Sequence, residues 1–394
     1  MLNTSLSPWP SFTQEEADAV SKVLLSNKVN YWTGTECREF EKEFAAFVGT
    51  QYAVALSNGT LALDVALKAM GIGQGDDVIV TSRTFLASAS CIVTAGANPV
   101  FADVDLNSQN ISSETIKAAL TPNTKAIIVV HLAGMPAEMD GIMDLAKEHD
   151  LWVIEDCAQA HGAKYKGKSV GSIGHVGAWS FCQDKIMTTG GEGGMVTTND
   201  KELWSKMWSY KDHGKSYDAV YHREHAPGFR WLHESFGTNW RMMEMQAVIG
   251  RIQLKRMPEW TARRQAHAAK LAESLGKFAS IRLIEVADYI EHAQYKFYAF
   301  VKPEHLKILG VDTNINAVVI KVSMIVAVFS GLSFVATTSS DEKYARSFLK
   351  PMIERIKHIL IIRDIYLGLL TMPKNEVLIP LEEEKSTEKE TDKA

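Results

Sequence analysis

The sequence predicts an α/β protein built around a large, mostly parallel β-sheet. Between about residues 50 and 200, apolar runs of strand length alternate with segments whose apolar residues recur at helical spacing. These runs are apolar throughout rather than at alternate positions, as is typical of strands covered on both faces. A chain of 394 residues is also long enough for more than one domain. We therefore expect a smaller second domain after the large one.

The expected strands and helices follow one another along the chain. A strand-like AVALS (53–57) precedes the others, and strands of the large sheet are expected at 77–82, 99–104, 126–132, 152–158, 176–181 and 193–198. Helical spacing is clear at 63–70 and 139–146, and a longer helical stretch runs from Arg241 to about Leu275. Strands at 280–286 and 295–301 are expected in the smaller domain. In such sheets ligands bind at the carboxyl ends of the strands, so residues at those ends are candidates for function.

Composition and charge exclude several classes of function. The net charge of −5 comes without a basic stripe, so nothing electrostatic indicates nucleic acid. Four cysteines lie far apart, with no Cys-x-x-Cys pair, which argues against a metal site and against a disulfide framework. The N-terminal residues lack the basic and continuous apolar regions of a signal peptide. We therefore expect reduced thiols and a cytoplasmic location.

Residues 321–340 are the one segment that raises the question of a membrane. They contain 19 consecutive residues without a formal charge after Lys321, which reaches the lower range of a spanning helix. Five serines, two threonines and a glycine dilute this run. We favour a buried element of the second domain and keep membrane contact as the alternative. The tail LEEEKSTEKETDKA is charged and predicted to be disordered.

The tripeptide Asn58-Gly59-Thr60 stands between a strand-like run and an amphipathic helix. Glycine lets the backbone approach a ligand closely, and a helix N-terminus offers free N–H groups to an anion. A phosphate site is one interpretation. The other is an ordinary helix cap made by Asn58 or Thr60, which is the commoner use of these residues.

Carboxylates end the strand VIED, where Glu155 and Asp156 are followed by Gln159. A carboxylate at a strand end, with an amide just beyond it, could hold a heteroaromatic N–H and a neighbouring phenolic oxygen. An aspartate that caps the following segment is the alternative.

The stretch SFCQDKIMTTGGEGG places Lys185 between Ser180, which ends a strand, and a glycine-rich turn. Lysine becomes a nucleophile when burial or a neighbouring charge lowers its pKa. Most lysines are solvated surface groups. The order of the three motifs along the chain is what favours a catalytic role for Lys185.

Other candidates are weaker. His131, at a strand end, either faces the site or is a hydrogen-bonded core histidine. Arg241 either binds a substrate anion or begins a helix at the surface. The spacing of His161 and His213 gives them no role, and no His, Cys and carboxylate cluster in the sequence indicates a metal.

Together these motifs resemble the DegT/DnrJ/EryC1/StrS family of sugar aminotransferases, from about Ser11 to about Val301. The matching segments are TGTECREFEKEFAAFVG, SNGTLALDVAL, TFLASASCIVTAGANPVFADVD, VVHLAG, VIEDCAQAHGAKYKG, SFCQDKIMTTGGEGGMVTTND and GTNWRMMEMQAVIGRIQL. The resemblance implies a pyridoxal-phosphate-dependent transferase of the aspartate aminotransferase fold (fold type I), with a large mostly parallel sheet domain and a smaller α/β C-terminal domain. After about residue 303 the sequence departs from the family pattern.

Two of the roles that the resemblance implies are catalytic. Lys185 would form the Schiff base with pyridoxal phosphate, and Asp156 would pair with the pyridine nitrogen. Gln159 would contact the ring hydroxyl. A carboxylate beside the protonated ring makes it an electron sink, and a freed lysine amine can move a proton at the reacting carbon.

The remaining implied roles hold the cofactor in place. Ser180, Gly59 and Thr60 would bind its phosphate, and Phe85 would stack on the ring. Asn239 would reach the phosphate of the neighbouring subunit, which implies a homodimer with shared active sites.

The resemblance also implies the substrates and the domains. The expected reaction transfers an amino group from glutamate to a nucleotide-linked keto-sugar, in amino-sugar or surface polysaccharide biosynthesis. The expected division of the chain is an N-terminal arm (1–30), a large cofactor-binding domain (31–250), the start of a small domain (251–310), an atypical apolar segment (311–380) and a charged tail (381–394).

Two alternatives remain open. One is a related sugar dehydratase, but that branch typically replaces the lysine by histidine, and one subgroup carries an iron–sulfur cluster. The presence of Lys185 and the cysteine spacing disfavour it. The other is a catalytically inactive or membrane-tethered protein that keeps the fold and uses its C-terminal region for attachment.

Overall fold

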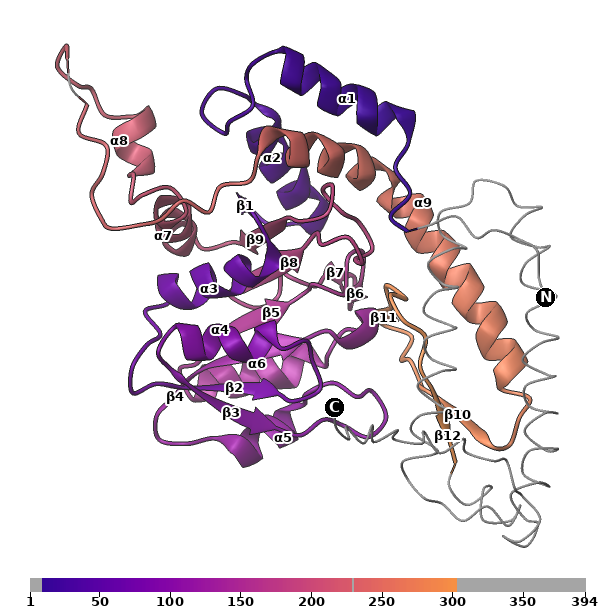
Figure 1. Ribbon diagram of the computed structural model, residues 1–394. Coiled ribbons are helices and arrows are strands. Elements are labelled where there is room, and N and C mark those ends of the chain that lie inside the picture. The colour runs from indigo at the N-terminus through magenta and orange to yellow at the C-terminus, as the bar shows by residue number, and fades with distance from the viewer. Residues whose placement is uncertain (1–8, 229, 303–394) are drawn as a thin grey trace, which may run out of the picture.

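The computed structural model describes residues 9–228 and 230–302 of the chain, and its centre is a seven-stranded sheet in the order β1-β9-β8-β5-β4-β2-β3 (Figure 1). The strands are β1 (Tyr52–Leu56), β2 (Asp77–Thr81), β3 (Asn98–Ala102), β4 (Thr124–Val130), β5 (Trp152–Asp156), β8 (Val176–Ser180) and β9 (Gly194–Thr198). Strand β9 is antiparallel to both of its neighbours, and the other pairs are parallel. The predicted α/β class and mostly parallel sheet are confirmed. Most expected strands run one or two residues too far, because their last residues leave the ladder and enter loops.

Helices cover both faces of this sheet (Figure 1). Their bounds are α1 (Gln14–Leu25), α2 (Glu36–Val48), α3 (Gly59–Ala69), α4 (Ala87–Thr94), α5 (Ser113–Ala119), α6 (Met139–Glu148), α7 (Lys201–Tyr210), α8 (Tyr217–Tyr221) and α9 (Glu244–Leu275), with a 3-10 turn at Leu132–Gly134. In β4, Ile128 and Val130 pack into one apolar cluster, with residues of α2, α3 and α4. Ile127 and Val129 pack into the other, with residues of α5 and α6. Burial on both sides explains why the strands are apolar throughout.

Helix α9 begins at Glu244, not at Arg241 as expected. Arg241 instead pairs with Leu56 in an isolated antiparallel bridge, and the Ser57 N–H donates to the Trp240 carbonyl at 3.0 Å. Backbone groups used in this way cannot begin a helix. The expected domain boundary at residue 250 falls inside α9, and the division into domains stays a prediction.

After α9 the chain contributes strands to two small sheets. Strands β10 (Ile281–Leu283) and β12 (Ala299–Val301) pair with each other, and β11 (Ile290–Glu291) pairs with β6 (Lys164–Tyr165), which continues to β7 (Lys168–Ser169). The expected strands at 280–286 and 295–301 are both too long. Residues 295–298 are not in a strand, because this segment crosses to the large domain, where the Lys296 N–H donates to the Ala133 carbonyl at 3.1 Å.

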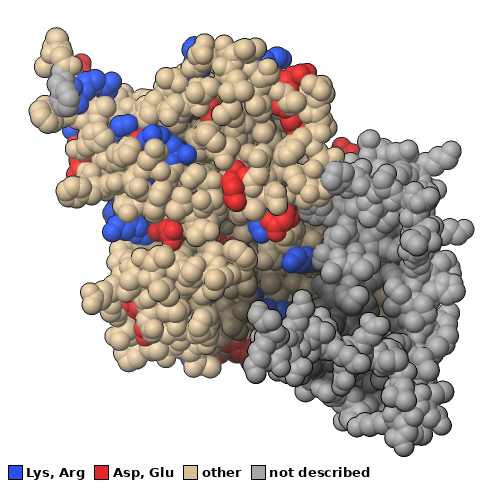
Figure 2. All heavy atoms as spheres, in the orientation of Figure 1, with Lys and Arg blue, Asp and Glu red and all other residues tan. Residues whose placement is uncertain are grey.

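The expectations for residues 311–380, which include 321–340, and for 381–394 lie outside the described residues. Within the described ranges, no helix combines the length and apolar character that crossing a membrane requires. On the face shown in Figure 2, basic and acidic side chains of the described residues are interspersed rather than gathered by sign.

Candidate active site

The carboxyl ends of every strand of the central sheet except β9 meet at one edge. The loops that leave β1, β2, β4, β5 and β8 begin there, and the paired residues Leu56, Ser180 and Gly194 place the start of β9 at the same edge. The loops with Gly59, Phe85, His131, Gln159 and Lys185 each follow one of these strands. The edge is therefore the place to look for a site.

Lys185 lies in the loop after β8, and its side chain is only 13% exposed. Its Nζ is 3.4 Å from a carboxylate oxygen of Asp184. The ring centres of Phe85 and Tyr295 lie 6.0 and 5.7 Å from the same nitrogen. An amine enclosed by two aromatic rings is not the solvated lysine of an ordinary surface, so the structure favours the functional interpretation of this residue.

Tyr295 and Asp184 close one side of this enclosure. The Tyr295 hydroxyl donates to Asp184 Oδ2 at 3.0 Å, which joins the second domain to the loop that carries Lys185. Burial, followed by the charge of Asp184, raises the pKa of the Tyr295 phenol, which stays protonated at neutral pH. Burial opposes ionisation of Asp184, but the charge of Lys185 and the hydrogen bonds from Tyr295, Cys182 and Lys185 together hold the pKa of that carboxyl below its usual range. Sequence reasoning missed both residues, since neither belongs to a motif of its own.

Asp156, the last residue of β5, is a buried carboxylate fixed by two donors. The Ser88 hydroxyl donates to Oδ2 at 2.6 Å, and the Ala158 N–H donates to Oδ1 at 3.1 Å. No helix follows, but the bond from the Ala158 N–H caps the turn after β5, so the capping interpretation describes Oδ1 while Oδ2 is held by Ser88. Ser88, on α4, was not predicted because a serine inside a helix gives no sequence signal.

Gln159 follows on the same loop and points toward the loop after β4. Its Oε1 accepts the Ala133 N–H at 2.8 Å. Ala133 has a positive φ of 58°, in the left-handed region that few residues other than glycine adopt. The Gln159 side chain supports this turn and leaves its amide nitrogen for another partner.

Gly59 opens α3 against Ser180. A Cβ placed on Gly59 would lie 2.4 Å from the Cβ of Ser180, so only glycine fits. Asn58 caps the helix by accepting the Leu61 N–H at 3.0 Å. The cap interpretation is thus right for Asn58, and Thr60, in the first turn, is exposed. A helix N-terminus beside a serine is a natural anion site.

Two expected residues are largely exposed to solvent. Phe85, after β2, is 68% exposed although its ring faces Lys185. Asn239 pairs with Asp212 through its backbone, and its side chain is exposed with no hydrogen bond to a described residue. Arg241 is neither a surface residue nor a free anion ligand, because its guanidinium is paired with the buried Asp212.

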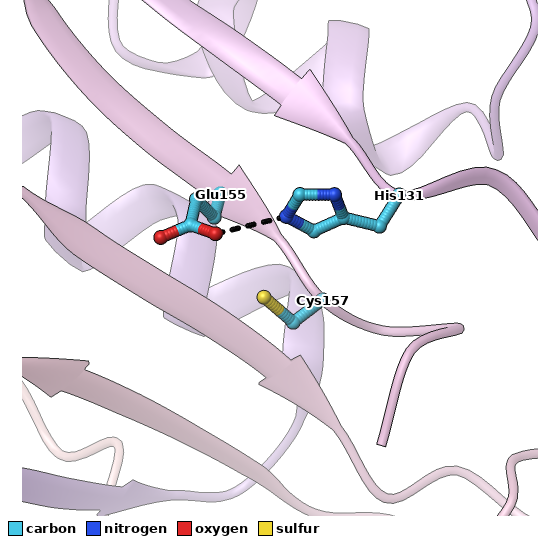
Figure 3. A group of neighbouring side chains, drawn as sticks. All are labelled: His131, Glu155 and Cys157. Atoms are coloured by element: carbon cyan, nitrogen blue, oxygen red, sulfur yellow. Dashed lines mark hydrogen bonds and ion pairs between the residues drawn. The ribbon is translucent and has the colours of Figure 1, made fainter. Parts of the chain in front are cut away.

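Figure 3 shows that His131, Glu155 and Cys157 form a separate cluster, whose ligating atoms lie within 4.8 Å of one another. His131 Nδ1 accepts the Ala137 N–H at 3.1 Å, so Nε2 carries the proton and donates to Glu155 at 2.9 Å. Burial raises the pKa of the Cys157 thiol. His131 is thus a hydrogen-bonded core histidine.

Glu155 is saturated by hydrogen bonds as well. Besides His131, the backbone N–H groups of Gly171, Ile173 and Gly174 donate to its carboxylate at 2.6–2.9 Å. Burial alone would raise the pKa of Glu155, but these donors outweigh it and hold the pKa below its usual value. A metal ion would have to displace these hydrogen bonds to reach the Glu155 carboxylate. The cluster is therefore explained by the 171–174 turn, whose backbone N–H groups Glu155 binds.

The residues at the sheet edge fit pyridoxal phosphate. Gly59 packs too closely on Ser180 to carry a Cβ, which sets the N-terminus of α3 directly beside the serine, where a phosphate is favoured. The enclosed amine of Lys185 and the buried carboxylate of Asp156 are the groups that a pyridine aldehyde needs.

Comparison with known proteins identifies the chain. The family model "DegT/DnrJ/EryC1/StrS aminotransferase family" matches residues 10–330, so the family pattern extends past Val301. The chain is 40% identical over 305 residues to the spore coat polysaccharide biosynthesis protein SpsC of Bacillus subtilis. The aligned region spans 77% of this chain and 75% of that protein. It is 42% identical over 260 residues to the GDP-perosamine synthase of Escherichia coli O157:H7, covering 65% and 67% of the two chains.

A solved structure agrees. The crystal structure of an aminotransferase from Psychrobacter cryohalolentis covers 78% of this chain and 83% of its own, with 62% identity and a TM-score of 0.75. These similarities confirm the family, the fold and the cofactor that the motifs indicated. The chain belongs to the DegT/DnrJ/EryC1/StrS aminotransferase family and is a pyridoxal-phosphate-dependent aminotransferase.

Proposed function

We propose that this enzyme transfers an amino group from glutamate to a nucleotide-linked keto-sugar, in the cytoplasm, during surface polysaccharide biosynthesis. The relatives support a sugar substrate, because one is a GDP-perosamine synthase and another is a spore coat polysaccharide biosynthesis protein. The observation that carries the proposal is the enclosed amine of Lys185 at the sheet edge that also bears Asp156 and Gly59.

We assign the cofactor contacts from this arrangement. Lys185 holds the aldehyde carbon, and Asp156 pairs with the ring nitrogen while Ser88 and Ala158 fix its orientation. The free amide nitrogen of Gln159 faces the ring hydroxyl, since its oxygen is already bound to Ala133. Ser180 and the first turn of α3, with Gly59 and Thr60, take the phosphate. Phe85 covers one face of the ring.

When bound, pyridoxal phosphate supplies an electron sink for the carbanion that forms at the α-carbon of the amino donor. The protein residues do the rest. The Asp156 carboxylate would stabilise a proton on the ring nitrogen. The amine of Lys185 would move the proton between the α-carbon of the amino donor and the cofactor, acting first as a base and then as an acid. Asp184 and the Tyr295 hydroxyl hold the lysine in place between its two transfers.

The active unit is a homodimer in this proposal. Several large apolar side chains are exposed on the chain, among them Phe85 at 68%, Leu86 at 73% and Phe236 at 99%. Side chains of this kind are enriched at subunit contacts. Asn239, exposed and without a side-chain partner among the described residues, reaches the phosphate bound by the neighbouring subunit.

Trapping with borohydride tests the cofactor role of Lys185. We expect the purified enzyme to absorb visible light and borohydride to fix the cofactor on Lys185. Lys185→Ala should lose both properties, whereas Lys68→Ala, which removes an exposed lysine on α3, should keep both. Glutamate should then convert the bound cofactor to its aminated form, and a nucleotide-linked keto-sugar should restore the starting spectrum. An enzyme that binds cofactor but responds to neither substrate would contradict the proposed reaction.

A further inference from the structure

Two cationic side chains beside the Lys185 enclosure have no carboxylate partner. These are Lys296, in the segment that crosses from the second domain, and Arg83, in the loop after β2. Among the described residues, no carboxylate oxygen lies within 4.0 Å of the side-chain nitrogens of either residue.

Lys296 is fixed beside the groups already assigned to the cofactor. Its backbone N–H donates to the Ala133 carbonyl at 3.1 Å, and the Ala133 N–H is the donor that binds Gln159. The Nζ of Lys296 lies 5.4 Å from the ring centre of Tyr295, whose ring centre is also 5.7 Å from Lys185 Nζ. Two ammonium groups therefore lie around one aromatic ring.

The carboxylates of this region are already engaged. Asp184 accepts from Lys185 and from the Tyr295 hydroxyl, and Asp156 accepts from Ser88 and Ala158. Burial, and next the charge of Lys185, lower the pKa of Lys296, while Asp184 acts in the opposite direction. A half-buried ammonium with this surplus of positive charge is stabilised by a bound anion.

Arg83 lies against the same segment that carries Lys296. Its guanidinium carbon lies 5.3 Å from the ring centre of Tyr298, two residues beyond Lys296, and it shares a loop with Phe85. Burial raises the pKa of Tyr298 although Arg83 opposes the shift, so the phenol adds no negative charge at neutral pH. The planar guanidinium suits two oxygens of one phosphate or carboxylate group.

We propose that Lys296 and Arg83 form a binding site for an anionic oxygen group of the substrate, a carboxylate or a phosphate. The source of the anion rests on the proposed function: glutamate carries carboxylates, and a nucleotide-linked sugar carries a diphosphate. Both substrates visit the same site in turn, so one pair of cations can serve either. Bound here, the anion holds the reacting group of the substrate close to Lys185.

Calorimetric titration of the cofactor-loaded enzyme with two unreactive probes tests this site. Glutarate represents the donor, and inorganic pyrophosphate represents the nucleotide. We expect Lys296→Met and Arg83→Gln each to weaken binding of at least one probe about tenfold, and Lys296→Arg to keep most of it. The controls are Lys68→Met and Arg282→Gln. Both remove a cation that lies over an aromatic ring elsewhere, and both should bind as the parent does.

The pattern of loss identifies the anion. If the variants bind only glutarate more weakly, the site belongs to the amino donor. If they bind only pyrophosphate more weakly, it belongs to the nucleotide. If they bind both probes more weakly, the two substrates share it. The inference is overturned if the parent binds neither probe, or if the two variants bind both probes as the parent does while keeping its absorption spectrum. A parent that fails to aminate keto-sugars but binds a probe through Lys296 would defeat the proposed function and leave the anion site standing.

Discussion

Gly59 is the residue at which the smallest change should disturb the cofactor site. An added methyl group would meet the Cβ of Ser180 at 2.4 Å and push apart two elements that the phosphate must bridge. Overpacking of this kind typically costs about 1–3 kcal/mol. We expect Gly59→Ala to bind pyridoxal phosphate at least about tenfold more weakly, as measured by titration of the apoenzyme.

Gly73→Ala is the matched control. Its Cβ would meet only the Ala95 carbonyl oxygen, at 3.7 Å, an ordinary contact. Cofactor affinity should be unchanged in this variant. If both alanine variants bind the cofactor like the parent, Gly59 does not line the phosphate site.

The charge of Glu155 stabilises the fold and takes no part in the proposed reaction. Its pKa lies below the usual value of 4.5, so its contribution is fully present above that pH and is lost as the pH falls through the folded-state pKa. Glu155→Gln leaves backbone donors of the 171–174 turn unmatched and should lower the free energy of unfolding by about 3 kcal/mol at pH 7.

Urea unfolding at a series of pH values checks this. The gap between the parent and Glu155→Gln should narrow as the pH falls below 4.5. Glu291→Gln, at an exposed ion pair with Lys164, should stay within about 0.5 kcal/mol of the parent throughout. A gap that is constant from neutral to acid pH would show that the charge of Glu155 is not what the turn requires.

The candidate site residues that could be predicted from the sequence are those that belong to short motifs. Asp156 and Ser180 end strands and Lys185 lies in the loop after Ser180, so the pattern of apolar runs alone brings all three to one edge of the sheet. Ser88 and Tyr295 could not be predicted, because each acts through a contact with a residue far away in the sequence: Ser88 with Asp156 and Tyr295 with Asp184. The functional roles themselves stay predictions.

At the scale of elements, α2 depends on a carboxylate supplied by α9. The buried Glu244 accepts the backbone N–H groups of Glu36 and Cys37, which open α2 and have no partner within that helix. We expect Glu244→Gln to lower the free energy of unfolding by about 2 kcal/mol in urea titration, since hydrogen bonds to charged groups are strong.

Glu39 provides the comparison within the same helix. It lies in the first turn of α2 but is paired with Lys42 at the surface, so Glu39→Gln should change stability by less than about 0.5 kcal/mol. Equal effects of the two substitutions would mean that general charge near the helix start, rather than the buried contact of Glu244, stabilises α2.

Elements were predicted well where one periodic pattern decides them and poorly where tertiary contacts compete. The strands of the central sheet are buried on both faces, and their apolar runs leave little choice. Residues 295–298 have strand-like composition, yet hydrogen bonds to the loop after β4 and to Asp184 draw them out of the ladder. This departure is what brings Tyr295 to Lys185.

At the scale of the whole molecule, the described chain leaves its site open on one side. Phe85 faces Lys185 but is 68% exposed, and Leu86 beside it is 73% exposed. An aromatic ring that stacks on a cofactor is expected to be shielded from solvent. We therefore propose that a second copy of the chain covers Phe85. We expect the purified enzyme to sediment as a dimer, and Phe236→Asp, at a side chain that is 99% exposed, to shift it toward monomer.

Mixing two inactive variants tests whether the subunits share their sites. In the proposed dimer, Lys185 acts within its own subunit and Asn239 acts on the phosphate bound by its partner. A hybrid of Lys185→Ala and Asn239→Ala subunits then contains one site with both residues intact and one with neither. After the subunits exchange at random, activity should recover to about a quarter of that of the parent, because half of the dimers are hybrids with one working site. Exchange that is demonstrated by tagged subunits without any recovery would place Asn239 in its own subunit's site.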